Sequence, residues 1–255
     1  MRRSKWTSAF QQDETGLGFW RRMVVVIVIS VGLIGAATIA GAQAGNPNPG
    51  VIPINAKPQG LSYGEWSARW WDWALSIPPS MNPVFDPTGA LCTQGQSGHV
   101  WFLAETFGGS ATRTCAVPAG TMLFFPILNG AFGSGLGDCP AGNPGPGCGV
   151  PTLRALAAAN VDPPVTLLVS IDGVPLTGLS AYRATSPVFS YTVTSDNIVG
   201  LLVGVPLPGG TYSPVVSDGY WLMLAPLSAG VHTIFIKGIS SGGLETDVAY
   251  NLTVQ

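Results

Sequence analysis

The sequence predicts a mainly β protein, an antiparallel β-sandwich of jelly-roll or immunoglobulin-like type with one Trp-rich amphipathic helix packed on it. Three observations support this prediction. Short apolar segments alternate every second residue along the second half of the chain, and 34 glycines and 22 prolines supply turns between them. One earlier segment carries a complete helix pattern, with a start signal and a stop signal.

The first 44 residues have the three parts of a cleavable export signal. Basic residues precede the apolar run VVVIVISVGLI, residues 24–34, and small residues lead to Ala42-Gln43-Ala44, which fits the A-x-A cleavage pattern. The alternative is a retained membrane anchor, because residues 23–42 approach the roughly 20 residues that a spanning helix needs. Since the apolar core is short and ends in small residues, we expect cleavage, and a mature protein that is secreted, periplasmic or at the cell surface.

The mature part, residues 45–255, carries few charges and no basic cluster. Of its 255 − 44 = 211 residues, six are Lys or Arg and 11 are Asp or Glu, so its net charge is 6 − 11 = −5. Nucleic-acid binding relies on clustered Lys and Arg, and that partner class is therefore not expected. Disorder is not expected either, because 46% of the chain is hydrophobic and it contains eight tryptophans.

All four cysteines lie in the mature part, as expected of an oxidising compartment. Cys139 and Cys148 bracket a Pro- and Gly-rich segment that a local bridge would staple, and Cys92 would then pair with Cys115. Four cysteines allow three pairings, and the sequence does not select one. Zinc binding is the alternative, but no C-x-x-C spacing is present and the two histidines are far apart in sequence. We expect disulfides, no metal and no cofactor.

Residues 45–60 are expected to form an extended leader, and residues 61–255 a single domain that begins with a long helix. Ser62 and Glu65 have the S-x-x-E spacing of a capping box, and Pro78-Pro79 ends the helix. The apolar face of the helix consists of Tyr63, Trp66, Trp70, Trp73, Ala74 and Ile77. Its polar stripe consists of Glu65, Arg69, Asp72 and Ser76. Trp71 and Leu75 flank that stripe.

After this helix the pattern changes to that of strands. In residues 247–254, four apolar side chains alternate with four others, the signature of a strand with one buried face. Residues 152–160 are expected to form a short helix behind Pro151. Strands are expected at residues 100–103, 113–117, 122–128, 165–171, 188–193, 201–205, 220–224, 231–237 and 247–254.

Several distinctive segments are spread over most of residues 61–240. They are Tyr63-Gly64-Glu65-Trp66, Ala68-Arg69-Trp70-Trp71, Trp73-Ala74, Gly95-Gln96-Ser97-Gly98, Val100-Trp101-Phe102-Leu103, Cys115-Ala116-Val117-Pro118-Ala119-Gly120, Phe124-Phe125-Pro126-Ile127-Leu128-Asn129, Asp218-Gly219-Tyr220-Trp221, Pro226-Leu227 and Gly230-Val231-His232-Thr233-Ile234. Together these segments resemble a family of secreted bacterial proteins that has no assigned function. The resemblance implies export and a shared fold, and it carries no catalytic residue to this chain.

The polar stripe of the helix supplies the first candidates for a binding site. Glu65 and Asp72 lie on the same side but about 10.5 Å apart along the axis, at a rise of 1.5 Å per residue, which fits neither geometry of a glycosidase pair. Arg69 has the spacing of an ion pair with each of them. An ion-paired stripe is thus the first interpretation, and a polar patch bordered by tryptophans that stack on sugar rings is the second.

No linear motif indicates catalysis. Ser-His-Asp chemistry needs a poised serine, and a G-x-S-x-G elbow is absent. His232 is expected at the start of a strand and Asp218 in a turn. The candidates for ligand binding are therefore Glu65, Arg69, Asp72, Trp71, Asp218 and His232.

The sequence predicts an exported, non-catalytic protein that is either a binding module or a structural component of the envelope. The expected partner is a polysaccharide or another component of the cell envelope. The alternative is an extracellular hydrolase whose acids converge from distant loops.

Overall fold

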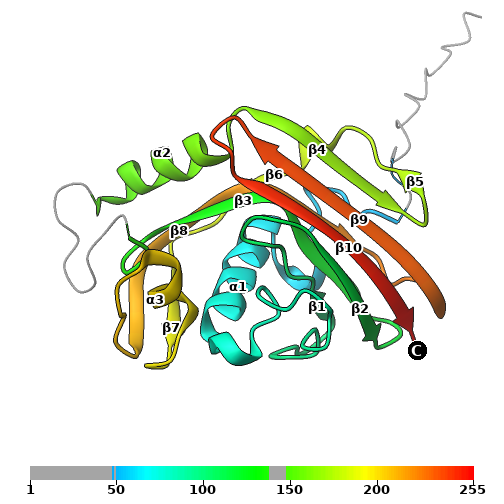
Figure 1. Cartoon of the computed structure of the whole chain (residues 1–255). Coiled ribbons are helices and arrows are strands. Elements are labelled where there is room, and N and C mark those ends of the chain that lie inside the picture. The colour runs from blue at the N-terminus through cyan, green and yellow to red at the C-terminus, as the bar shows by residue number, and fades with distance from the viewer. Residues whose placement is uncertain (1–47, 49, 138–147) are drawn as a thin grey trace, which may run out of the picture. The chain divides into compact units, whose positions relative to one another are not determined.

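The computed structural model of the chain describes residue 48, residues 50–137 and residues 148–255 (Figure 1). The expected export signal and its cleavage site lie outside the described residues. The described elements belong to one compact unit, residues 43–255. Among these elements, no helix is both long and apolar enough to cross a membrane.

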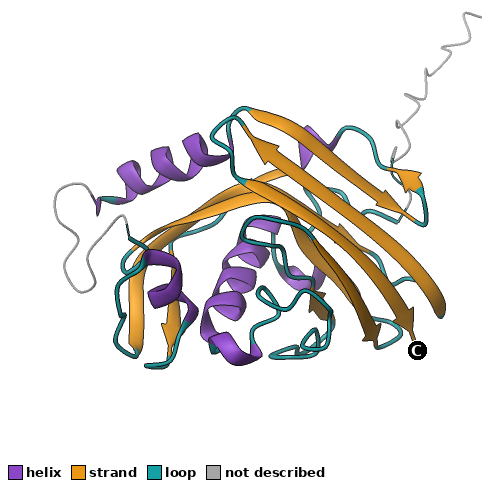
Figure 2. Cartoon of the chain, in the orientation of Figure 1, coloured by secondary structure: helices purple, strands orange, loops and turns teal. Residues whose placement is uncertain are grey.

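The fold is mainly β and contains two five-stranded sheets (Figure 2). In sheet A the order is β1 (Val100–Phe102), β3 (Met122–Gly133), β8 (Gly210–Leu224) and β6 (Arg183–Thr185), and β7 (Phe189–Val193) also pairs with β8. In sheet B the order is β2 (Ala111–Val117), β10 (Glu245–Val254), β9 (Gly230–Ser240), β4 (Pro164–Ile171) and β5 (Val174–Pro175).

Both sheets are mixed, which corrects the expectation of antiparallel sheets. One parallel pair occurs in each: β1 with β3, and β10 with β2. A parallel pair requires a crossover between its strands. Strand β2 provides that crossover, because it follows β1 in the chain but pairs in sheet B before β3 returns to sheet A.

Helix α1 (Tyr63–Ser76) has the bounds that its end signals predict, and its capping box is complete. Its aromatic face packs on sheet A, where the ring of Trp70 lies 5.6 Å from that of Trp221 on β8. Gly64 allows a close approach to β6, since a Cβ at this position would lie 2.1 Å from the carbonyl oxygen of Thr185. The helix is therefore fixed on the sheet by both its rings and its backbone.

Helix α2 (Val150–Val161) covers the other face of sheet A, against Val216 (Figure 1). The strand expected at residues 201–205 is wrong: residues 198–203 form helix α3 (Ile198–Val203). The Asn197 side chain caps its first turn, and Gly204 ends it in a left-handed conformation. These end signals outweigh the β-branched composition. Short 3₁₀ helices in the described part of the chain include η1 (Pro58–Gly60), η2 (Pro79–Met81) and η4 (Leu179–Tyr182).

The two sheets approach each other closely where β9 packs against β3. A Cβ at Gly238 would lie 2.0 Å from the carbonyl oxygen of Ile127, so only glycine permits this contact. One continuous apolar core includes buried residues from both sheets and from α1. The segment after residue 50 packs on this core as well, since Val51 is buried and pairs with Leu224 at the end of β8.

Two loops lie along the edges of the sheets. Cys92 forms a disulfide with Cys115 on β2, and the nearby Thr88 carbonyl accepts a hydrogen bond from the Thr114 amide. Along β1, the Gln96 side chain bonds both the amide and the carbonyl of Phe102, as a neighbouring strand would. The expected pairing of Cys139 with Cys148 involves a residue outside the described part of the chain.

Candidate functional site

A cleft of about 570 Å³ lies between α1 and the loop that leads into β1. We call it the α1 cleft. Three of its groups, Arg69, Asp72 and Ser76, come from the polar stripe of the helix. Its lining is Gln59, Trp66, Arg69, Asp72, Trp73 and Ser76 with Gly95, Ser97, Gly98, His99, Val100 and Phe102.

The floor of the α1 cleft is aromatic and held in place. Trp66 and Trp73 are each only 6% exposed, and their indole N–H groups donate to the carbonyls of Pro58 and Gln94 at 3.0 and 2.9 Å. The Phe102 ring fits between them, 6.1 Å from Trp66 and 5.4 Å from Trp73. The rings therefore form a rigid base, and polar groups supply the walls.

Arg69 is exposed, and its guanidinium lies 5.2 Å from the centre of the Trp66 ring. This cation–π contact orients the guanidinium without occupying its five N–H donors. The ion pairs expected for the polar stripe do not form, because Arg69 has no ion pair with any other described residue. Its donors face the cleft and are available to a ligand.

Asp72 connects the cleft to sheet A. Its Oδ1 accepts a hydrogen bond of 3.3 Å from the backbone amide of Thr192 on β7. Protein atoms around the carboxylate displace water and raise its pKa, although the side chain as a whole is exposed. Asp72 supplies acceptors in the same cleft in which Arg69 supplies donors.

Two other candidates on α1 lie outside this cleft. Glu65 completes the capping box: its Oε2 accepts from the backbone amide and the hydroxyl of Ser62, and these bonds lower its pKa. Trp71 is buried on another side of the helix and stacks on Phe107, with ring centres 6.3 Å apart. Both residues stabilise the fold and do not touch the cleft.

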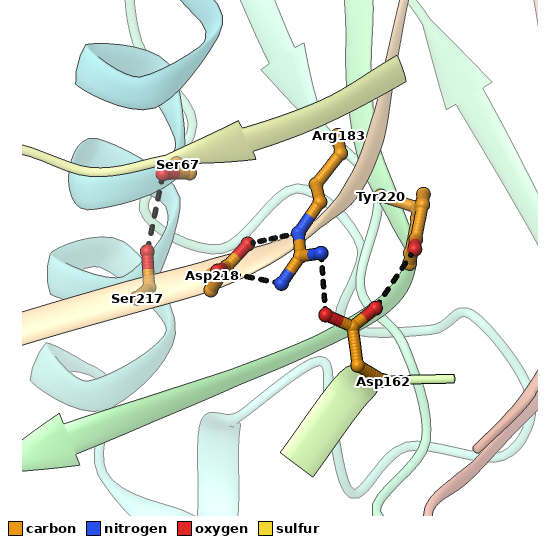
Figure 3. A network of polar contacts seen from close by, with 6 residues as sticks. All are labelled: Ser67, Asp162, Arg183, Ser217, Asp218 and Tyr220. Atoms are coloured by element: carbon orange, nitrogen blue, oxygen red, sulfur yellow. Dashed lines mark hydrogen bonds and ion pairs between the residues drawn. The ribbon is translucent and has the colours of Figure 1, made fainter. Parts of the chain in front are cut away.

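Asp218, which was expected in a turn, lies within β8 instead, because its neighbours pair with β3 on one side and β6 on the other. It is buried in an ion network that reaches the end of α2 (Figure 3). Arg183 on β6 contacts both of its oxygens, with Nε and Nη2 each at 3.0 Å, and its Nη1 reaches Asp162, the C-terminal cap of α2. Tyr220 donates to the same Asp162 at 3.2 Å. The bonds from Arg183 to Asp218 and, to a lesser extent, to Asp162 raise the pKa of Arg183. Because the network joins α2 to sheet A and leaves Asp218 buried, we assign it to the fold.

His232 contacts two segments that are distant in sequence. Its Nδ1 lies 2.8 Å from a carboxylate oxygen of Asp172, and its Nε2 lies 2.9 Å from the backbone carbonyl oxygen of Ser228 and 3.3 Å from the Ser228 hydroxyl. The bond to Asp172 is the main cause that raises the pKa of His232. A serine, a histidine and an aspartate therefore lie in contact here, although no linear motif in the sequence predicts it.

Glu105, which the sequence shows only as an isolated acid, is fully buried between the sheets. Asn129 of β3 and Thr246 of β10 donate to its Oε2 at 2.7 and 3.1 Å. Burial raises the pKa of Glu105 to about 7, in spite of these bonds and the positive charge of Arg113. No group of three or more His, Cys, Asp or Glu suited to a metal ion occurs among the described residues.

The sequence predicts only part of the α1 cleft. Arg69 and Asp72 come together there, whereas Glu65, Trp71, Asp218 and His232 lie elsewhere. The missed residues are those of the opposite wall, above all Ser97 and His99. Comparisons with models of protein families, with curated proteins and with solved structures found no match to this chain.

Proposed function

We propose that the chain is an exported protein that binds a polysaccharide of the cell envelope in the α1 cleft. The single observation that carries this proposal is the combination of a rigid aromatic floor with donors and acceptors that have few partners of their own. A sugar ring presents apolar C–H groups on one face and hydroxyls around its edge. The small exposed parts of Trp66 and Trp73 suit the apolar face of the sugar, and the polar groups of Arg69 and Asp72 suit its hydroxyls.

Export is supported by the Cys92–Cys115 disulfide, which is consistent with an oxidising compartment. The signal-like N-terminus predicted from the sequence points the same way. We also propose membership in the family of secreted bacterial proteins that the chain resembles. The assignment of the two sheets to a jelly-roll or immunoglobulin-like sandwich stays a prediction.

The hydrolase alternative has one specific observation in its favour, the contact of Ser228, His232 and Asp172. A general base must accept the proton of the serine on Nε2. Here Nε2 faces a carbonyl oxygen at 2.9 Å and Nδ1 faces a carboxylate at 2.8 Å. The carbonyl oxygen is the closer partner of Nε2, and the Ser228 hydroxyl lies farther away, at 3.3 Å. Because Nε2 is directed at a carbonyl oxygen rather than held by the serine hydroxyl, we prefer the binding function.

The test is a binding screen of the purified protein against envelope and neutral polysaccharides, read by thermal shift and then by calorimetry. Arg69→Ala and Asp72→Ala should each weaken the best ligand about tenfold, the effect expected when a buried hydrogen bond to a charged group is lost. Lys57→Ala is the matched control, because it removes an exposed cation that does not line the cleft. A ligand whose affinity survives both cleft variants, or falls equally with Lys57→Ala, would contradict the proposal.

A further inference from the structure

A second cavity, of about 310 Å³, lies beside the turn between β4 and β5, and we call it the hairpin cavity. It shares no lining residue with the α1 cleft. Its walls are aliphatic and contain no aromatic ring. They come mainly from the hairpin, with Ile171, Val174 and Leu176, and from the end of β8 and the following loop, with Leu224 and Leu227.

Specific polar contacts hold these walls together. Asn48 and Thr177 exchange two hydrogen bonds, of 2.7 and 2.8 Å, which attach the start of the described chain to the hairpin. The Gly50 carbonyl accepts from the amide of residue 225 at 2.8 Å, next to the end of β8. His232 attaches the loop after β8 to the hairpin through Asp172. The cavity is therefore built from three preformed segments, as ligand pockets usually are.

The polar groups at the cavity already have partners. Asp172 accepts from the Nδ1 of His232 and from the Thr233 amide at 2.8 Å each. The side-chain oxygen and nitrogen of Asn48 are both bonded to Thr177. A sugar, a nucleotide or a peptide placed here would leave its own polar groups unpaired, which is unfavourable. An uncharged hydrocarbon chain leaves none.

We propose that the hairpin cavity binds one unbranched aliphatic chain, the acyl chain of a single lipid molecule, with the polar head of the lipid outside. The walls match such a chain in polarity, and their one carboxylate, that of Asp172, is already bonded to His232 and to the Thr233 amide. This inference is independent of the polysaccharide proposal, since it depends on a different cavity and on different residues.

The experiment is isothermal titration calorimetry of the purified protein with 1-hexanol, 1-heptanol and 1-octanol, three neutral probes that differ by one methylene each. Affinity should increase about fourfold for each added methylene, the effect of burying one CH₂ group. Equal affinities for the three alcohols, or no binding up to their solubility limits, would overturn the proposal.

Two substitutions at exposed valines provide a matched comparison. Val174→Trp places a large ring at the cavity, whereas Val231→Trp makes the same change at a residue of β9 that does not line it. We expect Val174→Trp to weaken 1-octanol binding at least tenfold and Val231→Trp to leave it unchanged. Equal losses in the two variants, or no loss in either, would contradict the assignment.

If Val174→Trp does not fold, Leu176→Gln provides the same comparison, because it places an amide in an apolar wall. Arg69→Ala separates the two proposals. It should change polysaccharide binding only, and a loss of 1-octanol binding in that variant would also overturn the hairpin-cavity assignment.

Discussion

The imidazole of His232 is clamped between the carboxylate of Asp172, at 2.8 Å, and the carbonyl of Ser228, at 2.9 Å. The bond to the Asp172 carboxylate raises the pKa of His232 because it is strongest when the ring is charged. The contribution of this contact to stability must therefore depend on pH.

His232→Gln should lower the stability of the protein in mild acid and have little effect in alkali. Since the folded state raises the pKa of His232, the contribution is complete below the unfolded value of about 6.5 and is lost as pH rises through the folded value. Because Asp172 is 47% exposed, we expect a loss of at most about 1 kcal/mol. Urea unfolding at pH 5.5 and pH 9 measures it, and an equal loss at both would contradict the charged clamp.

Glu105→Gln should stabilise the protein at pH 8 and not at pH 4. Burial raises the pKa of Glu105 from 4.5 to about 7, so the folded state binds the proton more tightly than the unfolded chain. Stability therefore falls as pH rises between these two values, by about 3 kcal/mol in total. A glutamine at position 105 cannot ionise, so the variant should not lose this stability as pH rises, and its side-chain oxygen still accepts a hydrogen bond from Asn129. Thermal unfolding of both proteins across this range is the measurement, and parallel pH profiles would show that Glu105 does not titrate there.

Arg183→Met should destabilise the protein by about 2–4 kcal/mol, because it leaves Asp218 buried without its partner. This expected destabilisation is smaller than that for breaking a fully buried ion pair, because about a third of the Arg183 side chain is exposed. Adding Asp218→Asn should recover much of the loss by removing the unpaired charge. Denaturant unfolding of the single and double variants gives the coupling energy. Additive effects would mean that the two residues do not interact.

Gly238→Ala should destabilise the protein strongly, by more than about 3 kcal/mol, or prevent folding. Its Cβ would meet backbone, the Ile127 carbonyl oxygen at 2.0 Å, which a side-chain rotation cannot relieve. Gly242→Ala is the control, because the nearest atom to its Cβ is the Ser240 hydroxyl at 3.7 Å. Similar stabilities for the two variants, measured by thermal unfolding, would show that the sheets do not approach so closely at β9.

Elements with local signals were predictable from the sequence. The bounds of α1 follow from Ser62, Glu65 and Pro78, which lie within or next to the helix. The alternating strands follow from the same kind of evidence, since each needs only its own residues to show a buried face. The strand predicted at residues 201–205 belongs instead to α3 and its C-terminal cap, because Asn197 and Gly204 cap a helix that apolar composition alone does not reveal.

Features that depend on distant segments were not predictable. The parallel pair of β2 with β10 joins residues more than 130 positions apart, and alternation within a strand does not specify the direction of its neighbour. The same holds for the site. Arg69 and Asp72 were found because they share a helix face, whereas His99 reaches the α1 cleft only through the packing of another loop. His232 and Asp172 are 60 residues apart.

The Gln96 side chain along β1 and the disulfide-held loop along β2 have a consequence for self-association. An uncovered strand is a template on which another chain can add a strand, and such addition leads to aggregation. Gln96 occupies the hydrogen-bonding groups of Phe102, and the Cys92–Cys115 bridge keeps the loop of Thr88 on Thr114. In a chain with so few charges to repel its copies, these two contacts occupy backbone groups of two edge strands to which another copy could otherwise add a strand.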